Sequence, residues 1–435
     1  MSRHLPPGKE SLLGRWRPRA GARISIGLLC AAALLADTPA AAATAAAAAS
    51  ASASELAATP EQGRYLAAAG NCVSCHTRPG GAPFAGGLSF STPLGVIYST
   101  NITPDVQTGI GSWSAADLRR AMQHGVARNG DRLFPAFPYT SFTKVSDADI
   151  QAIYAYLRTV PAVRYRPPDN GWGFAMRWPM RLWNALFLSA GRFGINLSQS
   201  AEWNRGAYLV AGLGHCGSCH TPRNLLLAEK GDQAYQGGVL QAPVAKHQER
   251  RWSAVDLTNS PRGLGAWSVT ELAQYFQTGV SARAGTFGPM NEVIVNSLRV
   301  LAPEDTHAMA VYLKSLPASV PNEEPVSAQL ASAGAPIYKA RCEKCHGRSG
   351  RGGMFSGPPL QGSAVVQAAD PASLINIILY GPELPKEISY GEWDTMPSYA
   401  TILNDAQIAA VCNYVRGSWG NRGPAVSSKM AAAQR

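Results

Sequence analysis

Three copies of one five-residue pattern decide the fold of this chain: Cys72-Val73-Ser74-Cys75-His76, Cys216-Gly217-Ser218-Cys219-His220 and Cys342-Glu343-Lys344-Cys345-His346. Two cysteines separated by two residues and followed at once by histidine form the attachment pattern of c-type haem. Both thiols can form thioethers with one porphyrin, and the histidine is then placed to ligate its iron. The repetition predicts three covalently bound haem c groups, attached through Cys72, Cys75, Cys216, Cys219, Cys342 and Cys345, with His76, His220 and His346 as iron ligands.

Paired cysteines also occur in zinc sites and in thiol–disulfide sites. A zinc ribbon brings two pairs together over a short gap, whereas more than a hundred residues separate these pairs. A redox pair does not require the histidine that follows each pair here. Haem attachment is therefore the favoured interpretation. Of the remaining cysteines, Cys30 lies near the N-terminus, and Cys412 lies in a helical apolar pattern typical of a buried core thiol. No structural disulfide is expected.

The first 45 residues read as a secretory signal peptide. Residues 1–23 are rich in arginine and lysine, residues 24–36 are apolar, and small residues follow. The apolar run is too short to span a bilayer as a stable helix, so we expect cleavage and export to the periplasm. The signal contributes part of the formal net charge of +11, and haem propionates offset much of the rest. The basic balance therefore does not indicate a nucleic-acid partner.

The chain repeats one order of elements three times, which predicts a mainly α fold of three tandem cytochrome-c-like haem domains. In each repeat a short helix precedes the haem pattern, a long loop follows it, and a last helix closes the unit. Gly 43 and Pro 31 among 435 residues make these loops long and glycine- and proline-rich. The predicted organisation is a signal peptide (1–45), haem domains at 55–165, 199–320 and 325–422, an aromatic linker helix (166–198) and a flexible tail (423–435).

The sixth iron ligand is predicted by comparing the repeats with one another. A methionine thioether opposite the histidine is usual in electron carriers, and Met290 and Met396 each precede the last helix of their repeat. Either methionine could instead fill the core. The first repeat has Phe137 in this place, and phenylalanine cannot ligate iron. Its ligand is left open among Met122, His124, Tyr139, Met176 and Met180, a water molecule, or no sixth ligand.

The linker between the first two repeats allows two interpretations. Residues 170–201 contain three arginines and no acidic residue, with Trp172, Trp178 and Trp183 among them. Such a helix is typical of a membrane interface. We favour the other interpretation, a linker helix docked between haem units, with its aromatic side chains covering the porphyrin edges.

Several segments resemble the three-haem cytochrome c subunits of bacterial membrane-associated dehydrogenases: 101–104, 215–224, 288–290 and 416–421. The resemblance covers nearly all of the mature chain. It implies a catalytic dehydrogenase partner that holds molybdopterin, flavin or a quinone cofactor, and ubiquinone or a terminal oxidase as the acceptor. It also implies a place on the outer face of the cytoplasmic membrane, with peripheral membrane contact. The Ala136-Phe137-Pro138-Tyr139 form resembles the subunits paired with molybdopterin oxidoreductases.

We therefore predict an electron-transfer subunit with no catalytic residues of its own. No Ser-His-Asp array, P-loop or dinucleotide fingerprint appears in the sequence. The alternative is a haem enzyme in which the first haem, lacking a methionine, binds peroxide or another small ligand. A cytochrome subunit of an oxidase is a third interpretation, and no segment is long enough to make it an integral membrane protein.

Overall fold

The computed structural model describes residues 58–435 except 93–94, 171–176, 246–247, 322 and 354–355. The predicted signal peptide and Met176 lie outside the described residues. We use first, second and third segment for residues 58–165, 199–320 and 325–435. Within the described part, no helix is both long and apolar enough to cross a membrane.

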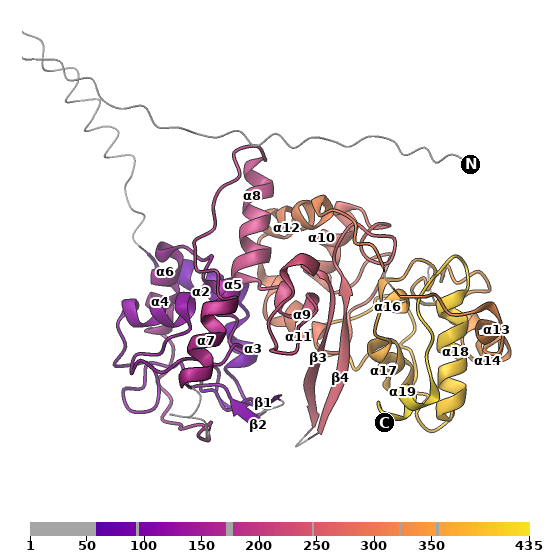
Figure 1. Ribbon diagram of the computed structural model, residues 1–435, viewed down its shortest axis with the longest axis horizontal. Coiled ribbons are helices and arrows are strands. Elements are labelled where there is room, and N and C mark those ends of the chain that lie inside the picture. The colour runs from indigo at the N-terminus through magenta and orange to yellow at the C-terminus, as the bar shows by residue number, and fades with distance from the viewer. Residues whose placement is uncertain (1–57, 93–94, 171–176, 246–247, 322, 354–355) are drawn as a thin grey trace, which may run out of the picture. The chain divides into compact units, whose positions relative to one another are not determined.

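Helices make up most of the regular structure (Figure 1). The first segment contains α2 (Pro60–Ala69), α3 (Cys72–Cys75), α4 (Ala115–His124), α5 (Tyr139–Phe142) and α6 (Asp147–Leu157), and α7 (Arg177–Phe187) follows it. The second contains α8 (Ala201–Tyr208), the π-helix η2 (Leu209–Leu213), α9 (Gly217–His220), η3 (Gly231–Gln233), α10 (Val269–Thr278), α11 (Met290–Asn296), η4 (Leu298–Val300) and α12 (Pro303–Ser315). The third contains α13 (Ala328–Ser332), α14 (Ala335–Arg341), α15 (Glu343–His346), α16 (Ala364–Gln367), α17 (Ala372–Tyr380), α18 (Asp405–Gly417) and α19 (Ser428–Ala432).

Side-chain caps fix where several of these helices begin. Ser114 accepts a hydrogen bond from the backbone of Asp117 at the start of α4, and Asp117 accepts one in return. Ser268 and Glu271 form the same capping box at α10. These boxes satisfy backbone N–H groups that have no partner within the helix. Each capping serine directly follows a tryptophan, Trp113 or Trp267, and marks the start of its helix.

A glycine lies where the helix before each haem pattern (α2, α8 or the start of α14) crosses the closing, or last, helix of its repeat (α6, α12 or α18). A Cβ atom added to Gly63, Gly206 or Gly334 would overlap the backbone carbonyl of Ala152, Ala308 or Ala410, respectively. Each of these alanines stands four residues before a tyrosine of the last helix, namely Tyr156, Tyr312 and Tyr414. Only glycine permits such close contact between two helix backbones. The same helix crossing is therefore built three times in the chain.

In the second segment, the stretch from the tyrosine of the first helix to the haem pattern is one residue longer than in the first segment. A π-helix accommodates the additional residue. Seven positions separate Tyr65 from Cys72, whereas eight separate Tyr208 from Cys216. The π-helix η2 lies within this longer stretch, directly after α8. A single π turn takes up one extra residue without breaking the helix. Cys216 consequently keeps its place despite the insertion.

The first and second segments share one hydrophobic core, which Ile388 of the third segment also joins, and the third segment has a second core of its own. The shared core includes Leu66 and Ile153 of the first segment together with Leu213 and Ile294 of the second. The third core is centred on buried residues of α14, α17 and α18. Cys412 belongs to it and is fully buried, as predicted. The chain thus folds as a joined pair of segments followed by a more independent third one.

Two reciprocal tyrosine–aspartate contacts join the first and second segments. Tyr65 on α2 donates to Asp305 at 2.6 Å, near the start of α12. Tyr208, at the end of α8, donates in the same way to Asp149 near the start of α6. The backbone N–H of Ala302 donates to the Tyr65 hydroxyl at 3.1 Å, and that of Ser146 donates to the Tyr208 hydroxyl at 3.1 Å. Each segment therefore gives the other an equivalent contact.

We expect Asp305 to make the joined segments sensitive to acid. Burial alone would raise the pKa of Asp305, but hydrogen bonds from Arg205 and Tyr65 outweigh it and hold this pKa below its ordinary value. The resulting stabilisation is present above the unfolded-state pKa of about 3.9 and is lost as the pH falls through the folded-state pKa. Asp305→Asn should lower the free energy of unfolding at pH 7 by about 2 kcal/mol and reduce the loss in acid.

Denaturant unfolding at pH 7 and at acid pH would measure this effect. Asp169→Asn, at an exposed position, is the matched control and should leave both values unchanged. An Asp305→Asn variant that lost as much stability in acid as the parent would contradict the assignment.

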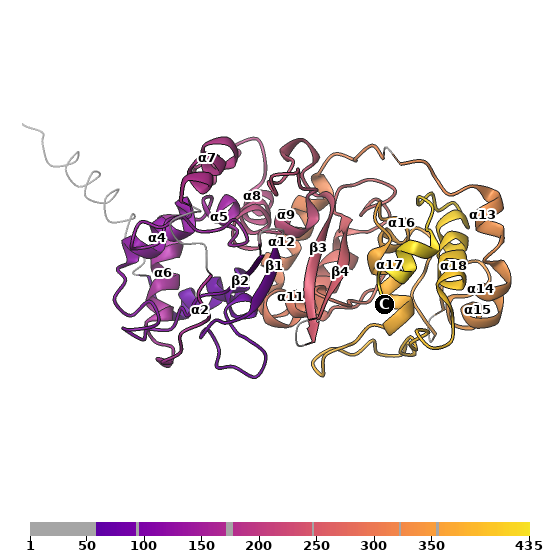
Figure 2. The same ribbon diagram turned by 60° about the horizontal axis from the view of Figure 1, so that its bottom comes forward.

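A β-hairpin of the second segment packs against the third segment. The mainly α fold predicted from the sequence did not include this hairpin. Strands β3 (Gln236–Ala245) and β4 (Gln248–Asp256) pair antiparallel, as do the shorter β1 (Ser89–Thr92) and β2 (Gly95–Tyr98). Strand β4 lies against α16 and α17 (Figure 2). The backbone N–H of Ser253 donates to the Ser373 hydroxyl at 2.9 Å, and Asn376 donates to the carbonyl of Arg251 at 2.7 Å.

The C-terminal residues are packed, so the predicted flexible tail at 423–435 is wrong. Helix α19 lies within this stretch, and Val426 and Ala431 are buried in the third core. Asn413 donates to the carbonyl of Val426 at 2.9 Å. Tyr380 donates to the carbonyl of Gln434 at 2.8 Å. Two buried apolar side chains and these hydrogen bonds give the tail a fixed place in the third segment.

Candidate haem sites

The three predicted haem histidines are held in the same way. The Nδ1 atom of His76 lies 2.6 Å from the carbonyl oxygen of Thr100. The Nδ1 atoms of His220 and His346 lie 2.7 Å and 2.9 Å from the carbonyls of Val255 and Pro358, respectively. A carbonyl oxygen can only accept, so each Nδ1 must carry the proton. The Nε2 lone pair of each imidazole is consequently left to bind a metal.

Burial keeps these imidazoles neutral. It lowers the pKa of His76, His220 and His346, and the hydrogen bond to the backbone opposes this only in part. A neutral imidazole whose remaining nitrogen is fixed in direction is the form that ligates iron.

The first cysteine of each haem pattern has the opposite character to a redox-active thiol. Burial raises the pKa of Cys72 and Cys216 to about 12 and that of Cys342 to about 11. A catalytic or disulfide-exchanging cysteine needs a lowered pKa. All seven cysteines of the described residues are free thiols. The thiol pairs therefore fit covalent attachment of haem better than thiol–disulfide exchange.

The site of the third segment lies on an apolar cavity that suits a porphyrin. Cys342, Cys345 and His346 line this cavity together with Met396. The structure thus brings all four predicted site residues of the third segment together. Among the other lining residues are Pro359, Leu360, Leu374, Ile378, Val411 and Val415. Thiols, an imidazole nitrogen and a thioether around one apolar cavity are the donor set of a c-type haem.

The second segment contributes to the wall of this third cavity. Arg283, Gly285 and Phe287, which precede Met290, line it along with Tyr390. Tyr390 lies against Gly285 and donates to the carbonyl of Thr286. The residues that directly precede Met290 therefore also form part of the wall of the third cavity.

Met290 itself occupies the first position of α11 and is half-buried against the shared core. This helix also reaches the first haem pattern, because Asn296 donates to the Ser74 hydroxyl at 2.8 Å. Ser74 lies between Cys72 and Cys75 on α3. The methionine helix of the second segment and the haem pattern of the first are thus direct neighbours.

The first segment has an aromatic cluster where the other two carry methionine. The ring of Phe137 lies 5.4 Å from that of Phe142. Phe142 in turn lies 5.5 Å from the ring of His215, the residue before Cys216. Phe137 is thus part of an aromatic chain that leads from the first segment to the second haem pattern.

The alternative ligands for the first haem are placed differently from one another. Met122 is buried in the shared core, whereas His124 is exposed at the end of α4. The Tyr139 hydroxyl donates to Asn184 at 2.7 Å. Met180 on α7 is buried in a small cluster that also contacts Phe137 and Tyr139. The structure therefore brings Met180, but not His124, into the surroundings of the Phe137 position.

Sequence reasoning did not find the acceptors of the three histidines or the residues that the second segment adds to the third cavity. Thr100, Val255 and Pro358 act through backbone carbonyls, which any residue type would provide. No sequence pattern could have identified them. The glycines at the helix crossings did leave a visible pattern, because Gly63, Gly206 and Gly334 each precede a tyrosine by two to four positions.

Comparison with known families agrees with this geometry. The cytochrome c family matches residues 60–161. The family described as cytochrome C oxidase, cbb3-type, subunit III matches residues 329–415. A c-type cytochrome with covalently bound haem is the class of protein that these matches and the site define.

Two relatives identify the family more narrowly. The chain is 41% identical over 402 residues to the gluconate 2-dehydrogenase cytochrome c subunit of Pantoea cypripedii, covering 87% of this chain and 90% of the relative. It is 38% identical over 391 residues to the alcohol dehydrogenase (quinone) cytochrome c subunit of Komagataeibacter europaeus, covering 85% and 82%. The chain belongs to the family of cytochrome c subunits of dehydrogenases.

A third relative is much longer. The chain is 42% identical over 385 residues to a subunit of the nicotinate dehydrogenase of Pseudomonas putida, and the match covers 85% of this chain but only 31% of that protein. The same cytochrome region thus occurs both in separate subunits and in a larger chain.

Proposed function

We propose that this chain is the periplasmic electron-transfer subunit of a dehydrogenase complex and carries three haem c groups. The observation that carries the proposal is the threefold repetition of one site, in which a histidine after a thiol pair fixes its Nδ1 atom on a backbone carbonyl. The three glycine helix crossings support three tandem haem domains, at residues 55–165, 199–320 and 325–435. Relatives named as cytochrome subunits favour this function over a haem enzyme.

In this proposal each residue of the donor set has a separate task. The six thiols attach the porphyrins, His76, His220 and His346 ligate iron on one side, and Met290 and Met396 do so on the other. Bound haem supplies a metal that accepts and releases one electron. The thioether ligands favour the ferrous form and raise its potential. The apolar walls of the third cavity exclude water and act in the same direction.

We infer electron exchange between the first two sites because they are neighbours: α11 contacts Ser74, and both Cys72 and Cys216 pack against the shared core. After burial, the charge of Cys219 is the largest influence that raises the pKa of Cys75 to about 11. The Cβ position of Gly70 lies 3.5 Å from both Cys72 Sγ and Leu213 Cδ2, so the two haem patterns approach each other. The third site adjoins the second through residues 283–287. These contacts support a continuous electron path through all three segments.

The donor in this proposal is a catalytic dehydrogenase subunit, and the acceptor is ubiquinone or a terminal oxidase. The resemblance described above and the relatives' names support such a donor. The resemblance of the Ala136-Phe137-Pro138-Tyr139 stretch to subunits paired with molybdopterin oxidoreductases favours a molybdopterin-containing donor over a flavin or quinoprotein one.

Haem counting would test the proposal directly. Protein produced with a haem-attachment system should contain three haems per chain by mass spectrometry. The double substitution of Cys342 and Cys345 by alanine should remove one of them and leave two. A mass that corresponds to fewer than three haems in the parent protein would refute the three-haem assignment. Failure of the reduced protein to pass electrons to a quinone or oxidase would refute the proposed acceptors.

A further inference from the structure

Helix α7 carries two apolar faces, and only one of them is covered. Met180 and Trp183 are buried on its inner side. Trp178, Leu182 and Leu186 recur at every fourth position and are 73%, 62% and 60% exposed. Residues spaced by four lie on one side of a helix. The outer side of α7 is therefore a stripe of three large apolar side chains in solvent.

The exposed stripe is not the result of a loosely docked helix. Trp183 donates through Nε1 to the carbonyl of Leu226 at 2.8 Å. Asn184 accepts from the Tyr139 hydroxyl at 2.7 Å, and both residues are buried. These contacts orient α7, and its outer side must point away from the protein.

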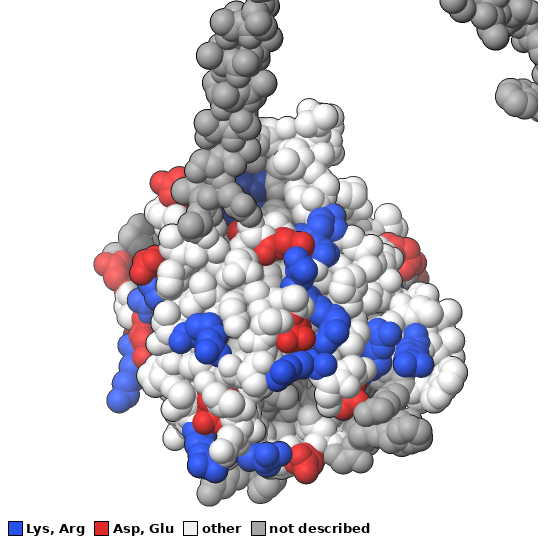
Figure 3. All heavy atoms as spheres, turned by 90° about the vertical axis from the view of Figure 1, so that its left-hand side faces the viewer, with Lys and Arg blue, Asp and Glu red and all other residues white. Residues whose placement is uncertain are grey.

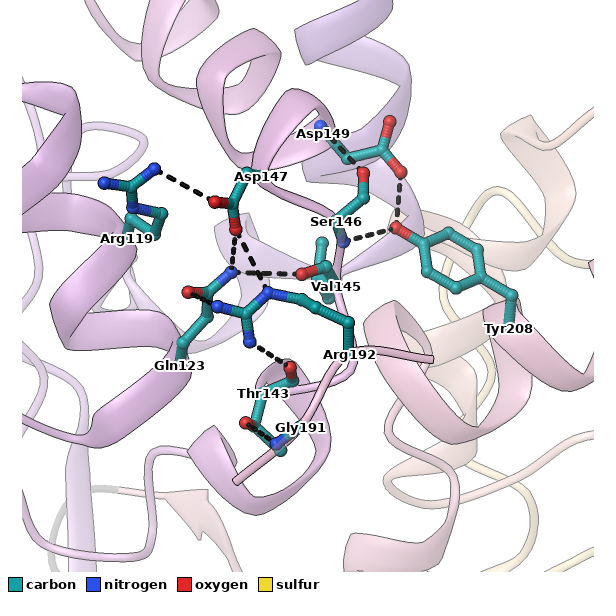
Figure 4. A network of polar contacts seen from close by, with 10 residues as sticks. All are labelled: Arg119, Gln123, Thr143, Val145, Ser146, Asp147, Asp149, Gly191, Arg192 and Tyr208. Carbon is teal, nitrogen blue, oxygen red and sulfur yellow. Dashed lines mark hydrogen bonds and ion pairs between the residues drawn. The ribbon is translucent and has the colours of Figure 1, made fainter. Parts of the chain in front are cut away.

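The chain after α7 is fastened to the first segment by Arg192 (Figure 4). Its guanidinium donates to Asp147 at 3.0 Å and to the carbonyl of Thr143 at 2.7 Å. It also donates to Gln123. Helix α7 is thus held along its inner face and again just beyond its C-terminal end.

A neighbouring loop adds two further exposed leucines. Leu225 is fully exposed and Leu226 is 57% exposed. The loop is fixed by Asn224, whose side-chain oxygen accepts from the backbone N–H of Leu226 at 2.9 Å and of Ala228 at 3.1 Å. The hydrogen bond from Trp183 to Leu226 joins this loop to α7. The two elements together present one apolar surface.

The stretch that carries α7 has charges of one sign, whereas beyond the leucine loop Glu229 pairs with Arg223 at 3.8 Å. Residues 170–201 contain three arginines and no acidic residue. The Arg181 guanidinium lies 5.8 Å from the centre of the Trp178 ring. By contrast, the side of the first segment in Figure 3 carries basic and acidic residues together. Within the first segment Arg119 pairs with Asp147 at 3.0 Å and Arg120 with Asp117 at 3.2 Å.

We propose that Trp178, Leu182, Leu186, Leu225 and Leu226 form a surface, the α7 surface, that docks on a bilayer containing anionic phospholipids. This inference rests on the proposed function and names the residues that make its membrane contact. Leucines enter the boundary of the acyl chains, tryptophan lies at the headgroup level, and arginines meet the lipid phosphates. A stripe on a stretch (residues 170–201) whose only charged residues are arginines fits an anionic lipid surface, because this stretch itself has no acidic residue that would repel the phosphates.

Vesicle flotation with the full haem-loaded protein would test the α7 surface. We expect binding to phosphatidylglycerol-containing vesicles and weaker binding to neutral vesicles or at high salt. The substitution pair Leu182→Glu and Leu186→Glu should lower the partition coefficient at least tenfold, because each leucine loses its transfer to the bilayer. Leu330→Glu, at another exposed apolar position, is the matched control and should bind as the parent does. Unchanged haem spectra would show that the variants are folded.

Two results with the variant that carries both glutamates would overturn the inference. One is undiminished vesicle binding by the variant with both glutamates. The other is a variant that still floats with vesicles but no longer associates with its dehydrogenase subunit, which would make the α7 surface a protein interface. A parent protein that carries three haems and transfers electrons normally, but does not bind vesicles, would refute the α7 surface and leave the proposed function standing.

Discussion

Replacing Gly334 by valine is expected to destabilise the third segment by about 3 kcal/mol or more. The Cβ position of Gly334 overlaps the carbonyl of Ala410 and lies 2.7 Å from the Cβ atom of Tyr414. A larger residue would have to push α14 away from α18, and these two helices hold Cys342 and much of the third core. Neither helix can yield locally, because the obstacle is backbone and not the end of a flexible side chain.

The effect should be confined to one part of the molecule. Since the third core is separate from the shared core of the first two segments, denaturant unfolding should show one transition at lower denaturant and another unchanged. Haem content should fall from three to two if the third segment fails to fold before attachment. Gly231→Val is the matched control, because nothing lies within 4 Å of its Cβ position. Equal stability of the two variants would contradict the helix-crossing assignment.

Replacing Met396 by alanine is expected to lower the potential of one haem by on the order of a hundred millivolts or more, within the roughly 0.8 V range that axial ligands control. Met396 lines the same cavity as His346 and the thiols of Cys342 and Cys345. The variant loses a soft ligand that favours the ferrous form. The near-infrared band of methionine-ligated ferric haem should weaken by one haem's share, and carbon monoxide should bind to the site.

The control for this experiment is Met430→Ala, because Met430 is an exposed methionine of the same segment. It should change neither the potential nor the spectrum. If the potentials of all three haems were the same in Met396→Ala as in the parent, Met396 would be a residue of the cavity wall and not a ligand. A redox titration followed by absorbance separates these results without any activity assay.

Much of the architecture could be predicted from local sequence. Capping residues such as Ser114 and Ser268 mark helix starts, because the cap bonds only to its own first turn. The β3–β4 hairpin could not be predicted in this way. Its stability depends on α16 and α17, which lie far away in the chain. The sequence predicts a flexible tail after residue 422, but Val426 and Ala431 pack into a core provided by α17 and α18.

The sequence by itself determined the chemistry of this protein. The two thiols and the histidine lie within five consecutive residues, so they can attach and ligate haem whatever the surrounding fold. Tertiary structure alone decided how the three patterns are related. It placed the first two patterns on one core and lined the third cavity partly with residues of the second segment. It also left Trp178, Leu182 and Leu186 exposed on the outer side of α7. The physical reason is that packing and exposure depend on contacts between distant segments, which local spacing does not record.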